Sequence, residues 1–146
     1  MTQVITTHQF TEAKAGLSDL MTDVIRHQRP TLIDRHGGKE NMLLLPQALL
    51  GLLVADHEFS TRATREGDEW LLFCPELNIA AAGETFDEAL DDLTESAEAY
   101  ARDFINRMAF FLETDRAAHL PWIMRLAACS DEDERRDLLA GSPPPQ

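Results

Sequence analysis

Carboxylates are the most abundant side chains in this sequence that could do chemistry. Four of them recur three or four residues apart, a spacing that gathers them on one face of a helix: Glu88, Asp91, Asp92 and Glu95. Clustered carboxylates can hold a hard cation such as magnesium. However, they form no loop with ligand spacing, and consecutive acids are typical of the solvated side of an amphipathic helix. We therefore predict no metal site.

No catalytic motif accompanies these carboxylates. The sequence contains no Gly-x-Ser-x-Gly, no glycine-rich phosphate loop and no His-Glu-x-x-His, and its five histidines are scattered. Cys74 and Cys129 lie far apart, without a CxxC motif or a histidine at ligand spacing, so we expect two buried free thiols. The sequence thus predicts a protein that is not an enzyme and needs no cofactor.

The charge of the chain is concentrated in its later part. The formal net charge is −13, from 13 Lys and Arg against 26 Asp and Glu. Residues 1–46 hold equal numbers of each sign, so the whole excess lies in residues 47–146. Because affinity for nucleic acid comes largely from Lys and Arg, DNA contact is expected only in the first third. The alternative is that the acidic excess serves solubility alone.

The first third has the pattern of a small β-α-β-β unit. Residues 4–7 are rich in β-formers, and apolar residues then recur at helical steps for about 16 positions, from Phe10 to Ile25. Pro30 ends this helix. Residues 31–35 and 41–45 favour strands joined by a glycine-rich hairpin turn. Such a short unit cannot bury its apolar face alone, so we expect it to dimerise.

Two segments of this unit match one family pattern in register. Thr11 to Ser18 reads Thr-Glu-Ala-Lys-Ala-Gly-Leu-Ser, against Ser-Glu-Ala-Arg-x-Asn-Leu-Ser. Pro30 to Gly38 reads Pro-Thr-Leu-Ile-Asp-Arg-His-Gly-Gly, against Pro-x-x-Ile-Thr-Arg-x-Gly. The unit therefore resembles the N-terminal domain of the Phd/YefM antitoxins, which dimerises and binds operator DNA. The resemblance implies that Lys14, Arg35 and Thr11 contact DNA.

The physical chemistry of these positions agrees with that role. Lys14 lies in the first turns of the expected helix and Arg35 ends a strand, so both could share one face, and a dimer would present each cation twice. Lysine lacks the planar fork of the family's arginine but keeps a charge for phosphate. The alternative is that both are solvated surface charges.

The middle of the chain has the pattern of three strands and a long helix. Residues 58–65, 70–74 and 78–83 favour strands. Thr85 and Glu88 form a capping box, in which the threonine hydroxyl accepts from the third helical N–H and the glutamate accepts from the cap N–H. The helix that follows keeps apolar side chains on one side for about five turns and acids on the other.

Two motifs in this block match a second family pattern. Pro75 to Leu77 reads Pro-Glu-Leu, and Gly83 to Leu90 reads Gly-Glu-Thr-Phe-Asp-Glu-Ala-Leu, against Gly-x-Thr-x-x-Glu-Ala-Leu. The block resembles the HicB-like antitoxin domain. That resemblance implies a truncated RNase H-like β-β-β-α module that packs against a toxin.

The last forty residues give a weaker signal. Residues 108–112 are densely apolar, residues 120–126 favour a helix with proline in its first turn, and residues 130–134 form an acidic helix start. Residues 141–146 are a proline-rich tail without packing capacity. Four large side chains could complete a core, form an oligomer contact or grip a partner, and core packing is the expected role: Phe110, Phe111, Trp122 and Met124.

These patterns together predict an α+β protein with three parts. Residues 1–54 form a Phd/YefM-like dimerisation and DNA-binding domain, and residues 55–128 form a HicB-like toxin-binding domain with C-terminal helices. Residues 129–146 form an acidic helix and a disordered tail. No apolar stretch approaches the roughly 20 residues of a membrane span, and no signal sequence is visible, so we expect a cytoplasmic protein.

The function that these predictions favour is that of an antitoxin in a type II toxin–antitoxin system. Its expected partners are operator DNA, a second copy in a homodimer or tetramer, and a basic toxin of the RelE/ParE or HicA type, which it would neutralise while repressing its own operon. The first alternative is a stand-alone transcriptional regulator without a toxin. The second is a magnesium-dependent hydrolase built on the RNase H-like module.

Overall fold

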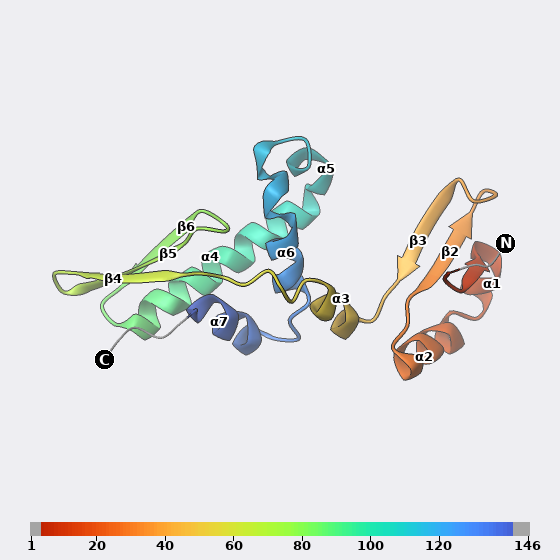
Figure 1. Cartoon of the computed structure of the whole chain (residues 1–146), viewed down its shortest axis with the longest axis horizontal. Coiled ribbons are helices and arrows are strands. Elements are labelled where there is room, and N and C mark those ends of the chain that lie inside the picture. The colour runs from red at the N-terminus through yellow and green to blue at the C-terminus, as the bar shows by residue number, and fades with distance from the viewer. Residues whose placement is uncertain (1–3, 142–146) are drawn as a thin grey trace. The chain divides into compact units, whose positions relative to one another are not determined.

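The computed structural model describes residues 4–141, and the chain divides into two compact units (Figure 1). We call Met1–Leu50 the first unit and Gly51–Gln146 the second unit. Within the described residues, each unit contains one three-stranded sheet, and the chain contains seven α-helices. The predicted α+β class is therefore confirmed. No helix in this range is long and apolar enough to cross a membrane.

The first unit has the sheet order β1-β2-β3, with two helices between β1 and β2. Strand β2 pairs in parallel with β1 and antiparallel with β3. Helix α3 continues across the boundary into the second unit. The elements are β1 (Thr7–Gln9), α1 (Phe10–Ala15), α2 (Leu17–His27), β2 (Thr31–Arg35), β3 (Glu40–Leu44) and α3 (Gln47–Leu53).

Two local predictions for the first unit are wrong in detail. The single helix expected from Phe10 to Ile25 is broken at Gly16, which adopts φ −120° and ψ 33° between α1 and α2. The first strand lies at residues 7–9 rather than 4–7, because its position is set by pairing with β2, where Thr7 faces Leu32. The hairpin forms as predicted except that its second strand lies at residues 40–44 rather than 41–45, and its tight turn uses three consecutive positive φ angles, at His36, Gly37 and Gly38.

The core of the first unit is small. Its buried apolar cluster consists of Ala13, Leu20 and Val24, with Ile33 and Leu44 packed against it. Large apolar side chains on α1, α2 and β3 remain exposed: Phe10, Leu17, Met21, Ile25, Met42 and Leu43. Over residues 4–50, the first unit therefore leaves more large apolar side chains in solvent than it buries.

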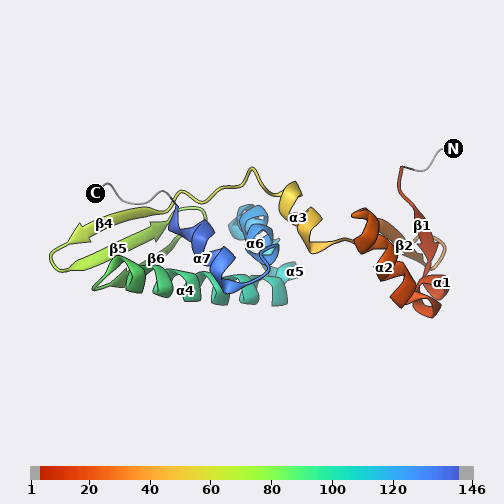
Figure 2. The same cartoon turned by 90° about the horizontal axis from the view of Figure 1, so that it is seen from below.

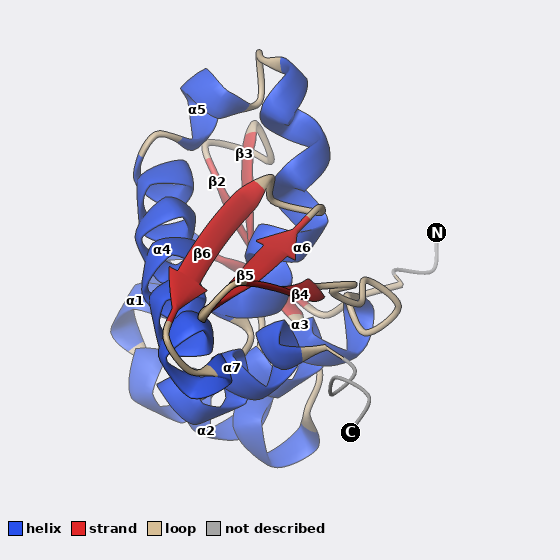
Figure 3. Cartoon of the chain, turned by 90° about the vertical axis from the view of Figure 1, so that its left-hand side faces the viewer, coloured by secondary structure: helices blue, strands red, loops and turns tan. Residues whose placement is uncertain are grey.

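The second unit is an antiparallel sheet covered on one face by a long helix. Strand β5 lies between β4 and β6 (Figure 3), and α4 runs along the sheet (Figure 2). The first strand begins at residue 62 rather than 58. The elements are β4 (Arg62–Glu66), β5 (Glu69–Cys74), β6 (Ile79–Gly83), α4 (Phe86–Asn106), α5 (Met108–Phe111), the 3-10 helix η1 (Asp115–His119), α6 (Leu120–Ala127) and α7 (Glu132–Ala140).

Helix α4 begins at the predicted cap. The Thr85 hydroxyl accepts a hydrogen bond from the Glu88 N–H at 3.1 Å. The Glu88 carboxylate accepts from the N–H of Glu84, at 3.1 Å, rather than from the cap N–H as predicted. Just before the cap, a Cβ on Gly83 would lie 2.5 Å from the Ala89 amide nitrogen, so glycine lets β6 and α4 approach closely.

The core of the second unit is extensive. Its buried cluster spans the sheet, α4, α5, α6 and α7, and includes Leu72, Leu93, Phe104, Ile123 and Leu139. The Phe104 ring stacks on the ring of Phe111, with centroids 4.8 Å apart.

The predicted core role of the C-terminal aromatic and methionine side chains holds with one exception. Phe111 is buried, and Trp122 and Met124 pack against the cluster, whereas Phe110 is 57% exposed. The acidic helix start is α7, whose cap residue Asp131 accepts from the Glu134 N–H. The predicted tail lies outside the described residues from residue 142 onward.

Both cysteines are buried and neither forms a disulfide, in agreement with the prediction. Burial raises the pKa of the Cys74 thiol to about 11. A thiol with so high a pKa stays protonated near neutral pH and is a poor nucleophile or metal ligand.

Candidate nucleic-acid interface

Two of the three predicted DNA-contacting residues lie on α1. Thr11 and Lys14 are three residues apart, so they are neighbours on the surface of the helix, and both side chains are exposed. Within the described residues, Lys14 forms no ion pair, and its ammonium group is available to a phosphate.

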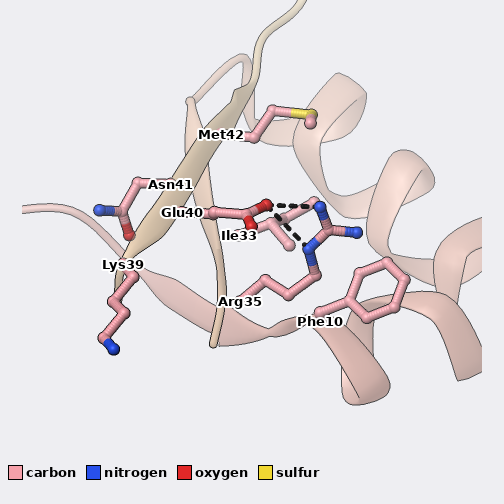
Figure 4. Close-up of a pocket in the computed structure, with 7 residues that line it drawn as sticks. All are labelled: Phe10, Ile33, Arg35, Lys39, Glu40, Asn41 and Met42. Carbon is pink, nitrogen blue, oxygen red and sulfur yellow. Dashed lines mark hydrogen bonds and ion pairs between the residues drawn. The ribbon is translucent and has the colours of Figure 1, made fainter. Parts of the chain in front are cut away.

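The third predicted residue, Arg35, ends β2 and already holds an anion. Its Nε donates to the Glu40 carboxylate at 3.1 Å, and its Nη2 donates to the same oxygen. Its guanidinium carbon lies 5.4 Å from the centroid of the Phe10 ring. Figure 4 shows the guanidinium between the carboxylate and the ring. The Arg35 and Glu40 side chains are each about half exposed.

Two hollows flank Arg35 on the surface of the first unit. One, of about 450 Å³, is drawn in Figure 4 and is lined by Phe10, Ile33, Arg35, Lys39, Glu40, Asn41 and Met42. The other, of about 490 Å³, is lined by Gln9, Phe10, Thr11, Asp34, Arg35, His36 and Gly37. The structure thus brings Thr11 and Arg35 to one hollow, while Lys14 lines neither.

Sequence reasoning missed Phe10 and Glu40 as neighbours of Arg35. The predicted second strand, at residues 41–45, excluded Glu40, whereas the observed strands at residues 31–35 and 40–44 make Arg35 and Glu40 directly opposite cross-strand partners. The signal for Phe10 was weak, since an aromatic residue that begins a helix is usually assigned to the core.

The carboxylates of α4 do not converge on a common point. Glu88 accepts from the Glu84 N–H, Asp92 accepts from the Ala82 N–H, and Asp91 accepts from the Arg136 guanidinium. Across residues 4–141, no group of three or more His, Cys, Asp or Glu side chains is arranged to hold a metal ion. These acids cap and brace the helix.

One polar cluster in the second unit joins Tyr100 to His119. The Tyr100 hydroxyl and the His119 Nδ1 are hydrogen-bonded at 2.7 Å, and the guanidinium carbon of Arg116 lies 5.7 Å from the centroid of the Tyr100 ring. Burial, with the Arg116 charge as a second cause, lowers the pKa of His119. Burial also raises the pKa of Tyr100.

Comparisons with known proteins agree on the class of the chain. A family model described as PHD-like, "Antitoxin of toxin-antitoxin, RelE / RelB, TA system", matches residues 1–141. A crystal structure from Syntrophomonas wolfei subsp. wolfei, described as an antitoxin part of a toxin/antitoxin system, is similar with a TM-score of 0.76 and 20% sequence identity. The match covers 94% of this chain and 99% of that one. No curated protein matches the sequence.

Proposed function

The chain belongs to the PHD-like family of toxin–antitoxin antitoxins. We propose that it binds operator DNA with its first unit and a basic toxin with its second. Its family makes it a non-enzymatic regulatory protein. The proposal includes repression of its own operon and a location in the cytoplasm, where operator and toxin are both found.

The partition of charge is the observation that carries this proposal. The first unit is electrically neutral, and the whole net charge of −13 lies in the second. A neutral surface with exposed cations can approach a phosphate backbone, whereas a strongly acidic one is repelled by it and attracts basic proteins. The boundary in charge coincides with the boundary between the two compact units.

The element order of each unit supports the finer family assignments. The first unit runs strand, helices, strand, strand, as expected of a Phd/YefM-like domain over residues 1–54. The second begins with three antiparallel strands and a long helix, as expected of a HicB-like domain over residues 55–128. In this proposal, α7 belongs to the toxin-binding unit, because Leu139 is fully buried in its core.

We assign the DNA contacts to Lys14, Arg35 and Thr11. The two cations neutralise DNA phosphates. The Thr11 hydroxyl donates a hydrogen bond to an oxygen of the DNA backbone, close to the phosphate that Arg35 binds. In the full chain, Lys14→Ala with Arg35→Ala should weaken binding to the promoter DNA upstream of its own gene and to unrelated duplex by a similar factor. The slope of log affinity against log salt should fall by about 0.9 for each phosphate that the variant no longer neutralises. Unchanged gel shifts would show that these residues do not contact DNA.

Dimerisation is proposed from the exposed apolar side of α2. Leu17, Met21 and Ile25 recur every four residues and are 46%, 50% and 56% exposed. Pairing two such stripes would supply the burial that the small core lacks. Met21→Glu should convert a dimer into monomers in analytical ultracentrifugation. Thr22→Glu, which adds the same charge one residue along the exposed surface, should leave the dimer intact.

The toxin partner is assigned to the second unit by charge. All eight cations of this unit are arginines, and several already pair with acids of the same unit, as Arg107 does with Asp103 and Arg135 with Glu98. The excess of carboxylates is therefore free to face a basic toxin of the RelE/ParE or HicA type, steer its approach and cover the cations it uses on RNA.

Co-expression with the product of the neighbouring gene tests this assignment. A fragment of residues 55–146 should bind that product and protect cells from it. Protection by residues 1–54 alone would reverse the division of labour, and the absence of any complex with the full chain would favour a stand-alone regulator.

A further inference from the structure

The anionic group that binds the Arg35 guanidinium is a carboxylate of the protein itself. Glu40 sits directly opposite Arg35 in the β2–β3 hairpin and receives two N–H groups of its guanidinium on one oxygen. His36 Nε2 lies 3.6 Å from the other oxygen of the same carboxylate. The tight left-handed turn at residues 36–38 brings these three side chains together.

The arrangement around Arg35 has the chemistry of a phosphate site. A guanidinium offers two parallel N–H donors to a single anionic group, and carboxylate and phosphate oxygens accept them alike. The Phe10 ring, 5.4 Å away, packs against the guanidinium and limits its orientation. The 450 Å³ hollow beside it leaves room for a larger anion on the side where Glu40 now binds (Figure 4).

We propose that Glu40 is an internal competitor for the DNA phosphate that Arg35 binds, so that the affinity of the first unit for DNA is set by exchange of one anion for the other. This inference rests on the proposed function, because it assumes that Arg35 contacts DNA. Binding breaks the two hydrogen bonds to Glu40 and forms equivalent bonds to a phosphate oxygen, with no covalent change.

The exposure of the pair makes this exchange feasible. The Arg35 side chain is 49% exposed and the Glu40 side chain 53%, so water screens their attraction and can solvate Glu40 when it is released. A buried pair would resist the exchange, since separating it would leave an uncompensated charge. Glu40 thus lowers affinity without blocking the site.

The test is DNA binding by full-length Glu40→Gln at one salt concentration. Loss of an exposed ion pair should tighten binding by about two- to five-fold for each Arg35 engaged. Glu40→Thr, which suits an exposed strand position, should act in the same direction. Two probes are needed: the promoter duplex of the protein's own gene and a random duplex of equal length. Phosphate contacts carry no sequence information, so both should gain by a similar factor.

A matched control separates the contact from the charge. Glu12→Gln removes the same charge from the exposed surface of α1, where no contact joins Glu12 to Arg35 within the described residues. It should change affinity less than Glu40→Gln does. In addition, the gain from Glu40→Gln should disappear in an Arg35→Ala background, because the competition needs both partners.

The outcomes distinguish a failure of the competition by Glu40 from a failure of the DNA assignment. If Arg35→Ala weakens binding but Glu40→Gln changes nothing, or still tightens binding without Arg35, the competition is wrong and the DNA assignment stands. If only the promoter duplex gains, Arg35 reads a base and the phosphate assignment is wrong. If Arg35→Ala itself leaves DNA binding unchanged, the proposed function of this surface fails together with the inference.

Discussion

The two units differ most in how they use their apolar side chains. In the first unit, the buried apolar cluster has only three members, and the exposed sides of α2 and β3 carry Met21, Ile25, Met42 and Leu43. Among residues 51–141 of the second unit, fifteen side chains form one buried cluster that joins the sheet to four helices. We expect a unit with so small a core to gain stability from a partner, and the second unit to need none.

Of the substitutions that test this difference between the units, Phe104→Ala should change stability most. The ring is fully buried against Phe111, and its removal should lower the free energy of unfolding of the second unit by about 3–5 kcal/mol. The fluorescence of Trp70 and Trp122 during denaturation reports on this unit alone, because both tryptophans belong to it.

Phe110→Ala is the control, since it deletes the same ring from a side chain that is 57% exposed. Its cost should be a small fraction of the Phe104 effect. Equal effects of the two substitutions would show that the core is not where the structure has it.

A pair of glycine substitutions should act in opposite directions in the two units. A Cβ at Gly83 would lie 2.5 Å from the Ala89 amide nitrogen, so Gly83→Ala must displace backbone and should destabilise the second unit by about 1–3 kcal/mol. A Cβ at Gly16 would lie 3.7 Å from the Glu12 carbonyl oxygen, an ordinary contact, and φ at Gly16 is negative. Gly16→Ala should therefore stabilise the first unit by about 0.4–1 kcal/mol. Thermal unfolding followed by circular dichroism measures both changes, and destabilisation by Gly16→Ala would mean that the break between α1 and α2 requires glycine.

A smaller effect is expected from the pH dependence of the second unit. Burial lowers the pKa of His119 in the folded chain below the value of 6.5 that it has when unfolded. The unfolded state therefore binds more protons than the folded state near that pH. The free energy of unfolding should be highest above pH 6.5 and should fall as the pH drops towards the pKa of His119 in the folded chain. The first unit should not share this dependence through His119.

Denaturant titrations read by tryptophan fluorescence between pH 7.5 and 5 would measure this loss. His119→Gln should flatten the curve in that interval, because glutamine cannot be protonated there. An unchanged curve in the variant would assign the pH dependence to other groups.

Sequence patterns predicted the second unit better than the first, for a physical reason. The Thr85 capping box and the apolar side of α4 depend only on residues close together in sequence, within one helix and its cap. In the first unit, β1 is positioned by pairing with β2, and α1 ends at Ala15, before Gly16, although the apolar periodicity continues through this point. Tertiary pairing overrides local propensity at β1, whereas the break after α1 coincides with a glycine, a residue of low helix propensity.

The candidate interface could be predicted only in part for a similar reason. Motif matching supplied Lys14 and Arg35 as cations, but it treated each as a free charge. The Glu40 partner depends on the register of the hairpin, which aligns Arg35 with Glu40 across the strands. In the second unit, too, a contact between residues far apart in sequence could not be predicted: Arg136 of α7 donates to the Asp87 and Asp91 carboxylates of α4.

Amide hydrogen exchange on the full chain tests the division of labour between the units most directly. Promoter DNA should slow exchange within residues 4–50, above all in α1 and the β2–β3 hairpin, and leave the second unit unchanged. The toxin should slow exchange within residues 51–141 instead. Protection of the acidic second unit by DNA, or of the β2–β3 hairpin by the toxin, would contradict the account.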